Sequence, residues 1–121
     1  MILLDTNVLI EILKGNEETI QKVESFNSTL YISSVTVMEL YYGAINKSEV
    51  QKLEKFILLF TVLQIDTKIS IRATALIKMY AKSHNLDIPD SLIAATTLEK
   101  SLTLFTYNTK DFKYISNIKL I

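Results

Sequence analysis

The stretch Ile2-Leu3-Leu4-Asp5-Thr6-Asn7-Val8-Leu9-Ile10 carries the pattern from which the fold class is predicted. Its apolar start, Ile2 to Leu4, ends abruptly in three polar residues, and apolar residues return from Val8 onward at helical spacing. A short continuous apolar run is typical of a buried strand in a parallel sheet, and the polar cluster is typical of a helix start. We therefore predict a strand that leads directly into a helix.

The same succession of strand and helix continues along the chain. Further strands are predicted at Leu30-Tyr31-Ile32, Val62-Leu63 and Thr103 to Thr106, and Ile118 to Ile121 is a candidate fifth strand. Helices are predicted between them over residues 8–13, 17–26, 34–45, 48–57, 67–83 and 91–100. Strands that alternate with helices indicate a mostly parallel sheet, here of four or five strands, covered by helices on both faces. The length of 121 residues suits one domain, residues 1–121.

Composition narrows the chemistry available to the chain. There is no cysteine and only one histidine, His84, which excludes thiolate sites and sites built from several imidazoles. Any metal must then be held by oxygen ligands, which favours a hard cation such as Mg²⁺ or Mn²⁺. The only glycines, Gly15 and Gly43, form no phosphate-cradling loop.

Charge and hydropathy bear on location and partners. The absence of cysteine suits a reducing cytoplasm, where we expect the protein to reside. We expect no membrane span and no signal peptide, because no apolar run is long enough and the start has no positive region. The formal net charge is zero, which weighs against nucleic-acid binding, since such proteins usually carry a basic surface. Any contact with RNA would have to come from a local patch.

Three carboxylates occupy positions that suit a functional site. Asp5 follows the first predicted strand, where ligands bind in parallel sheets, although an N-cap role is equally compatible. Glu39 is the only charged residue of its apolar helix segment, so it is solvated, paired or bound to a ligand, because a buried unpaired carboxylate is costly. Asp90 follows Pro89 and competes with Asp87 for a helix start, which the helix dipole alone would explain.

Considered together, these carboxylates predict a metal site at one edge of the sheet. Clustered acids raise one another's pKa unless a cation neutralises them. Carboxylates and water are the usual ligands of Mg²⁺ near phosphates, and such an ion activates bound water for hydrolysis.

Four segments of the chain carry a family resemblance. They are Ile2 to Ile10, then Ile32-Ser33-Ser34-Val35-Thr36-Val37-Met38-Glu39-Leu40-Tyr41-Tyr42-Gly43, then Ile88-Pro89-Asp90-Ser91-Leu92-Ile93-Ala94-Ala95, and finally Leu104-Phe105-Thr106-Tyr107-Asn108-Thr109-Lys110-Asp111-Phe112. In this order and spacing the chain resembles the PIN-domain nucleases, and more narrowly the VapC-type toxins of toxin–antitoxin pairs. The resemblance covers essentially the whole chain and implies a three-layer α/β/α fold and a metal-dependent endoribonuclease.

The resemblance also assigns roles to individual residues. Asp5, Glu39 and Asp90 fall on the acidic positions of the family, with Asp5 and Asp90 the expected ligands of Mg²⁺ or Mn²⁺. Thr6 falls on the position whose hydroxyl supports the first acid.

The fourth acidic position is where the chain departs from the simplest family pattern. Asn108 occupies a position that is acidic in many relatives, whereas others carry an acid at the position of Asp111. Because an amide cannot act as a base, we favour Asp111 as the fourth catalytic acid and keep Asn108 as a supporting residue. A cap on a short helical turn is the alternative role for Asp111.

The resemblance implies three partners. RNA is the expected substrate, and a homodimer is the expected assembly. An antitoxin is expected to insert an amphipathic segment into a groove between helices, near apolar residues that also suit a core: Tyr41, Tyr42, Phe56, Leu59 and Phe60.

Other functions remain open from the sequence. A non-catalytic interaction module of the same fold would carry a broken set of acids, whereas three are intact here. An aspartate-dependent phosphatase usually needs an acid two residues after the nucleophile, where this chain has Asn7. A receiver-like signalling domain would need an acidic pair beside the first strand.

Overall fold

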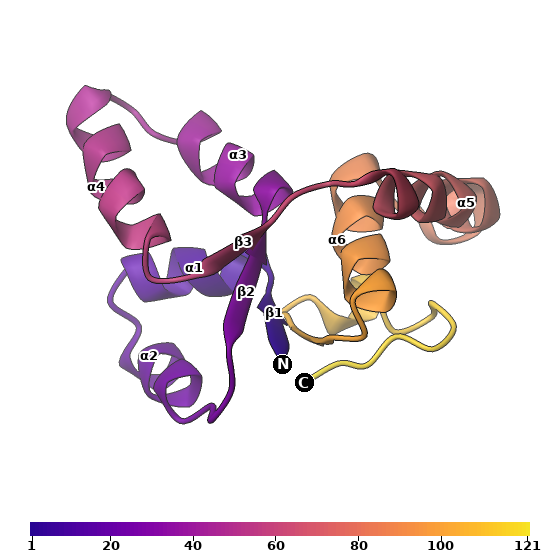
Figure 1. The fold of residues 1–121 in the computed structure, drawn as a ribbon, viewed down its shortest axis with the longest axis horizontal. Helices are drawn as coiled ribbons and strands as arrows, with labels where there is room; N and C mark the ends of the chain where they lie inside the picture. Colours follow the sequence, from indigo (N-terminus) through magenta and orange to yellow (C-terminus); the bar gives the residue numbers. More distant parts are fainter.

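The structure, a computed structural model, describes residues 1–121 and is built around one parallel sheet (Figure 1). The sheet has four strands in the order β3-β2-β1-β4, namely β1 (Ile2–Leu4), β2 (Leu30–Ser33), β3 (Thr61–Leu63) and β4 (Thr103–Phe105). The helices are α1 (Thr6–Leu13), α2 (Glu17–Glu24), α3 (Ser34–Tyr42), α4 (Lys47–Ile57), α5 (Thr67–His84) and α6 (Ile88–Glu99), followed by the short 3₁₀ helix η1 (Thr109–Asp111). The predicted fold class, helices on both faces of a parallel sheet, is confirmed.

Strand β1 is central and pairs in parallel with both β2 and β4. The register places Ile2 opposite both Leu30 and Thr103, and Leu4 opposite Phe105. The carboxyl ends of the three strands therefore meet at one edge of the sheet, with Asp5 in the middle of that edge.

Successive side chains of the strands point to opposite faces and feed two separate cores. Leu3 and Leu104 belong to a core covered by α5 and α6, whereas Leu4, Ile32 and Phe105 belong to a core covered mainly by α1, α2, α3 and α4. Figure 1 shows these two groups of helices on opposite sides of the sheet. None of the helices has both the length and the apolar composition that a membrane crossing requires.

The candidate fifth strand, Ile118 to Ile121, does not form. The C-terminal segment makes only an isolated bridge between Leu104 and Leu120, with Leu104 N–H donating to the Lys119 carbonyl at 2.8 Å and Ile121 N–H donating to the Leu104 carbonyl at 2.9 Å. Asn117 adopts a left-handed conformation with φ of 67° just before this bridge, so the chain turns and meets β4 at one residue only. The sheet accordingly has four strands.

Helix α6 begins earlier than the predicted start at Ser91. Asp87 is its N-cap, with Oδ1 accepting from the Asp90 N–H at 2.9 Å, and Pro89 lies in the first turn. Proline suits that position because the first-turn N–H groups have no partner within the helix. Asp90 therefore lies inside the first turn of α6, and Asp87 takes the cap position for which the two residues compete.

The boundary between α3 and α4 also differs from the prediction. Helix α3 ends at Tyr42 rather than Ile45, and α4 is capped by Asn46, whose Oδ1 accepts from the Glu49 N–H at 2.9 Å. Asparagine is among the preferred N-cap residues, so the helix begins at Lys47, one residue before the predicted start at residue 48.

Candidate active site

Asp5 lies at the carboxyl end of β1 and is only 5 % exposed. Its Oδ1 accepts from the Thr6 N–H at 2.8 Å, and its Oδ2 accepts from Thr106 Oγ1 at 2.8 Å and from Asn7 Nδ2 at 3.3 Å. Burial raises the pKa of Asp5, the hydrogen bonds lower it, and the charge of Asp111 raises it further, with a net increase. Asp5 is thus both the N-cap of α1 and a desolvated carboxylate that a nearby cation would stabilise.

Thr6, the first residue of α1, connects the carboxyl end of β1 to helix α3. Its hydroxyl donates to Glu39 Oε1 at 2.8 Å and lies 2.9 Å from Thr36 Oγ1. Since Thr6 has one hydroxyl proton, the two contacts are satisfied together when Thr36 donates to Thr6 and Thr6 donates to Glu39. The predicted support of Asp5 by the Thr6 hydroxyl differs from this arrangement: the backbone N–H of Thr6 contacts Asp5, and its hydroxyl holds the exposed Glu39.

Asp90 lies half-buried in the first turn of α6 and has the most perturbed carboxyl group of the site. Burial, followed by the negative charges of Asp87, Asp5, Asp111 and Glu39, raises the pKa of Asp90 to about 7. Asp5, Glu39 and Asp111, the other acids proposed from the sequence, thus all act on the Asp90 carboxyl group. The four residues come from separate parts of the chain.

Asp111 and Asn108 both lie in the segment that follows β4. The charge of Asp111 contributes to the raised pKa of both Asp5 and Asp90. Asn108 is exposed, its side chain makes no capping hydrogen bond to η1, and its backbone N–H donates to Thr106 Oγ1 at 3.0 Å. Asp111 therefore acts on the other acids through its charge, and Asn108 contributes a backbone contact to the Asp5 network.

No group of three or more acidic or histidine side chains is packed closely enough to hold a metal ion by itself. The donor set nevertheless fits a hard cation, because buried and mutually repelling carboxylates are stabilised by a positive charge. Mg²⁺ is usually bound by one or two carboxylates together with several waters. The arrangement fits this mode, with Asp5 and Asp90 as the desolvated pair.

Several residues contribute to the acidic site although no role there was predicted for them from the sequence. Thr106 and Asn7 donate to Asp5, and Asp87 acts on Asp90 by its charge. Tyr114 has a buried hydroxyl without a hydrogen-bond partner, and burial together with the charges of Asp90, Asp111 and Asp87 raises its pKa. Thr106 was recognisable in principle, because it directly follows β4 as Asp5 follows β1.

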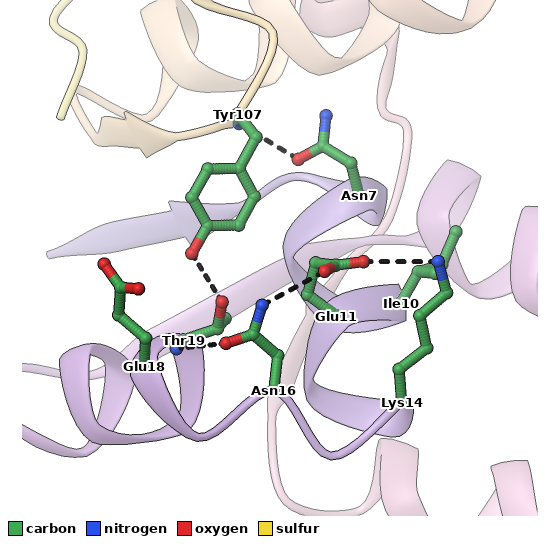
Figure 2. A pocket seen from close by; sticks show the side chains of 8 residues that line it. All are labelled: Asn7, Ile10, Glu11, Lys14, Asn16, Glu18, Thr19 and Tyr107. Atoms are coloured by element: carbon green, nitrogen blue, oxygen red, sulfur yellow. Dashed lines mark hydrogen bonds and ion pairs between the residues drawn. The ribbon is translucent and has the colours of Figure 1, made fainter.

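A pocket of about 510 Å³ opens beside the acids (Figure 2). It lies between α1, α2 and the segment after β4, and it is lined by Asn7, Ile10, Glu11, Lys14, Asn16, Glu18, Thr19 and Tyr107. Asn7 joins this pocket to the acidic cluster, since its Nδ2 donates to Asp5 Oδ2 and its Oδ1 accepts from the Tyr107 N–H at 3.1 Å.

Comparison with known proteins assigns the chain to a family. The family model described as PIN domain matches residues 2–118. The chain belongs to the PIN domain family. In this family context, the acidic edge of the sheet is a candidate active site, in addition to the cap that Asp5 provides for α1.

Individual relatives of this PIN domain cover nearly its full length. The chain is 38 % identical to Toxin FitB from Neisseria gonorrhoeae, over 93 % of this chain and 91 % of the relative. It is 32 % identical to the tRNA(fMet)-specific endonuclease VapC from Salmonella typhimurium, over 98 % and 94 % of the two chains. Among solved structures it resembles the DNA-bound VapBC from Salmonella typhimurium, with a TM-score of 0.87, 29 % identity and coverage of 99 % and 96 %.

Proposed function

We propose that this PIN-domain chain is a metal-dependent endoribonuclease and the toxin of a toxin–antitoxin pair. The proposal rests on Asp5, which is buried at the carboxyl end of β1 and held by three hydrogen-bond donors. It is supported by Asp90, whose pKa is raised to about 7 by burial and by the charges of Asp87, Asp5, Asp111 and Glu39. Structural carboxylates are normally separated or paired with cations, whereas clustered and desolvated ones are typical of sites that bind a metal or move protons. Relatives named as ribonucleases or endonucleases support the same reaction class.

In this proposal Asp5 and Asp90 hold Mg²⁺ or Mn²⁺. When bound, such an ion lowers the pKa of its water and neutralises charge that develops on phosphate oxygens. Glu39, held by the Thr6 hydroxyl, orients a water at the rim of the site, and Asp111 adds the remaining negative charge. Asp5 is kept in place by three donors, so its orientation does not depend on the ion.

RNA is the proposed substrate, although the chain has a formal net charge of zero. Lys110 and Lys113 are exposed on either side of Asp111 and provide a local positive patch for the phosphate backbone. A cellular RNA substrate implies a cytoplasmic protein. Residues 1–121 form one nuclease domain in this proposal.

The test is cleavage of a mixed RNA pool by purified protein with Mg²⁺, Mn²⁺ or chelator, for the wild type beside Asp5→Asn and Asp90→Asn. We expect loss of at least about a hundredfold in rate for each variant and complete loss with chelator, since each carboxylate is a proposed ligand. Asp66→Asn is the matched control, because Asp66 is an exposed cap of α5 distant in sequence from every site residue.

Each alternative function has its own signature in the same experiment. Equal cleavage by the wild type and both variants would refute the assignment of the site. Binding of RNA without cleavage would favour a non-catalytic interaction module, and a trapped aspartyl-phosphate would favour a phosphatase.

An antitoxin is the proposed protein partner. Two adjoining hollows run along α1, α3 and α4, and their apolar residues include Ile10, Leu13, Met38, Leu40, Tyr42 and Leu53. Tyr42 is 94 % exposed and Met38 is 59 % exposed, which is unusual for large apolar side chains on neighbouring turns. Glu39 lies in both hollows, so an amphipathic segment bound there would also cover the acidic site. Solved complexes of similar chains, FitAcB and VapBC, support a partner of this kind.

A homodimer is the proposed assembly, and α5 offers a surface for it. Ile71, Ala75 and Met79 are exposed at helical spacing along one stripe of this helix. Ile71→Lys is expected to convert a dimer to a monomer in light scattering, while Lys78→Glu on the same helix serves as the control.

A further inference from the structure

The pocket beside the acids has the features of a nucleobase site. We propose that it binds one base of the RNA next to the cleaved bond and that it prefers guanine. This inference rests on the proposed ribonuclease function and adds a determinant of substrate choice to it. Its first support is position, because Asn7 lines the pocket and donates to Asp5 Oδ2, so an occupant of the pocket lies next to the acidic cluster.

The second support is a fixed aromatic wall. Tyr107 is 47 % exposed, yet its ring is held at both ends. Its hydroxyl lies 2.6 Å from Thr19 Oγ1, its N–H donates to Asn7, and its ring meets Phe105 edge-on at 5.2 Å between centroids. Single-stranded RNA is recognised mainly by bases that stack on such rings, and a preorganised ring loses little entropy when a base binds.

The third support is the charge of the pocket. Glu11 is already engaged, since its Oε1 accepts from Asn16 Nδ2 at 3.1 Å and its Oε2 lies 3.4 Å from Lys14 Nζ. Glu18 makes no hydrogen bond or ion pair, and Figure 2 shows its side chain extending from α2 on the Tyr107 side of the pocket. The three charged residues, Glu11, Glu18 and Lys14, sum to one negative charge, which disfavours a phosphate.

An unpaired carboxylate beside a stacking surface selects a base that offers two adjacent N–H donors. Guanine presents N1–H and N2–H₂ side by side on its Watson–Crick edge, which matches the two oxygens of Glu18. Adenine and cytosine offer one exocyclic amino group beside an acceptor nitrogen, and uracil offers one N–H between two carbonyls. Guanine is therefore the base for which both oxygens of Glu18 find a partner.

The test measures RNA binding by amide NMR of the labelled full chain. Chelator is present throughout, so that the RNA is not cleaved. The probes are short uridine oligonucleotides whose central base is guanine, hypoxanthine, adenine, cytosine or uracil. Hypoxanthine keeps N1–H but lacks the 2-amino group, so it isolates the second hydrogen bond. We expect shifts at Asn16, Thr19 and Tyr107, and affinity for the guanine probe about tenfold above the hypoxanthine probe.

Variants assign that preference to the pocket. Glu18→Gln is expected to reduce the guanine preference to about twofold or less, because one acceptor oxygen becomes a donor. Glu17→Gln is the matched control, since Glu17 is the exposed neighbour in the same first turn of α2 and does not line the pocket. Tyr107→Leu is expected to weaken all probes alike, because stacking is tolerant of base identity.

The outcomes separate this inference from the proposed function. Equal affinity for the guanine and hypoxanthine probes, shifts outside the pocket, or no shifts at millimolar RNA would overturn the guanine site. Cleavage that depends on Asp5 but has the same base preference in wild type and Glu18→Gln would leave the ribonuclease standing without it. Guanine-selective binding by a protein that cleaves no RNA would support the guanine site and refute the ribonuclease function.

Discussion

The hydroxyl group of Thr6 links helix α1 to helix α3 at the site. It receives the hydroxyl hydrogen of the buried Thr36 and donates its own to Glu39, so it holds an otherwise mobile glutamate toward the acidic edge. A glutamate side chain loses considerable rotamer freedom when it is fixed, and the Thr6 hydrogen bond compensates for part of that cost.

Thr6→Val is expected to lower the rate of RNA cleavage about tenfold while the protein stays folded, because Glu39 loses the donor that orients it. Thr6→Ser keeps the hydroxyl and is expected to retain most of the activity. Single-turnover rates with matched circular dichroism spectra check both variants. A Thr6→Val protein with wild-type rates would contradict a role for Glu39 orientation.

Asp90 gives the stability of the metal-free protein a specific pH dependence. Its pKa lies near 7 in the folded chain and near 3.8 when unperturbed, so the folded state keeps a proton that the unfolded chain releases in this interval. Stability from Asp90 is therefore fully present below the unfolded pKa and is lost as the pH rises through about 7. Asp90→Asn is expected to flatten this decline.

Thermal unfolding in chelator, measured for wild type and Asp90→Asn across that interval, checks the prediction. The difference between the two proteins isolates Asp90 from the other carboxyl groups, including Asp5, whose pKa is also raised. Added Mg²⁺ is expected to stabilise the wild type most at the upper end of the interval, where Asp90 is ionised. Parallel pH profiles for the two proteins would refute the assignment.

At the scale of elements, the N-terminus of α6 combines a cap and a cluster of acids. Asp87 accepts from the Asp90 N–H and so fixes the first turn, but its charge also opposes ionisation of Asp90. The same residue therefore stabilises the helix and destabilises the charged form of its neighbour.

A pair of substitutions at Asp87 separates these two effects. Asp87→Asn keeps an acceptor for the cap and removes the charge, so it is expected to lower the pKa of Asp90 with little change in stability. Asp87→Ala removes both and is expected to cost about 1 kcal/mol of unfolding free energy. Carboxyl NMR titration and chemical denaturation measure the two quantities. A pKa of Asp90 that is unchanged in Asp87→Asn would show that the charge of Asp87 does not reach it.

For the whole molecule, the decisive feature is that one thin sheet separates two cores. Adjacent residues of β1 point in opposite directions, Leu3 into the core under α5 and α6 and Leu4 into the core under α1 to α4. The acids of the site come from both halves, since Glu39 lies on α3 and Asp90 on α6. The site therefore exists only when both cores are formed.

Leu4→Ala and Leu104→Ala each remove a fully buried side chain from a different core. We expect each to cost about 2–5 kcal/mol and each to leave a single unfolding transition, because the cores share the strands. Leu58→Ala is the control, since Leu58 is 82 % exposed and should change stability by less than about 0.5 kcal/mol. Two separate transitions in either core variant would show that the halves unfold independently.

The order of strands and helices was accessible from the sequence because it depends on interactions between near neighbours in the chain. Apolar periodicity and capping side chains predicted every strand that forms and the approximate extent of each helix. The errors fell at helix ends, as at the start of α4 beside Asn46, or where pairing needs a distant partner, as in the segment that ends at Ile121.

The sequence by itself determined the parallel fold class and the carboxylates that follow the strands, because both are set by residue type and short-range spacing. Only the tertiary structure decided that Thr6 binds Glu39, that Asp111 acts on Asp5 and Asp90, and that Tyr107 closes a pocket against α2. Hydrogen bonds, desolvation and charge repulsion depend on distances in space, and these distances follow from how the two cores pack against one sheet.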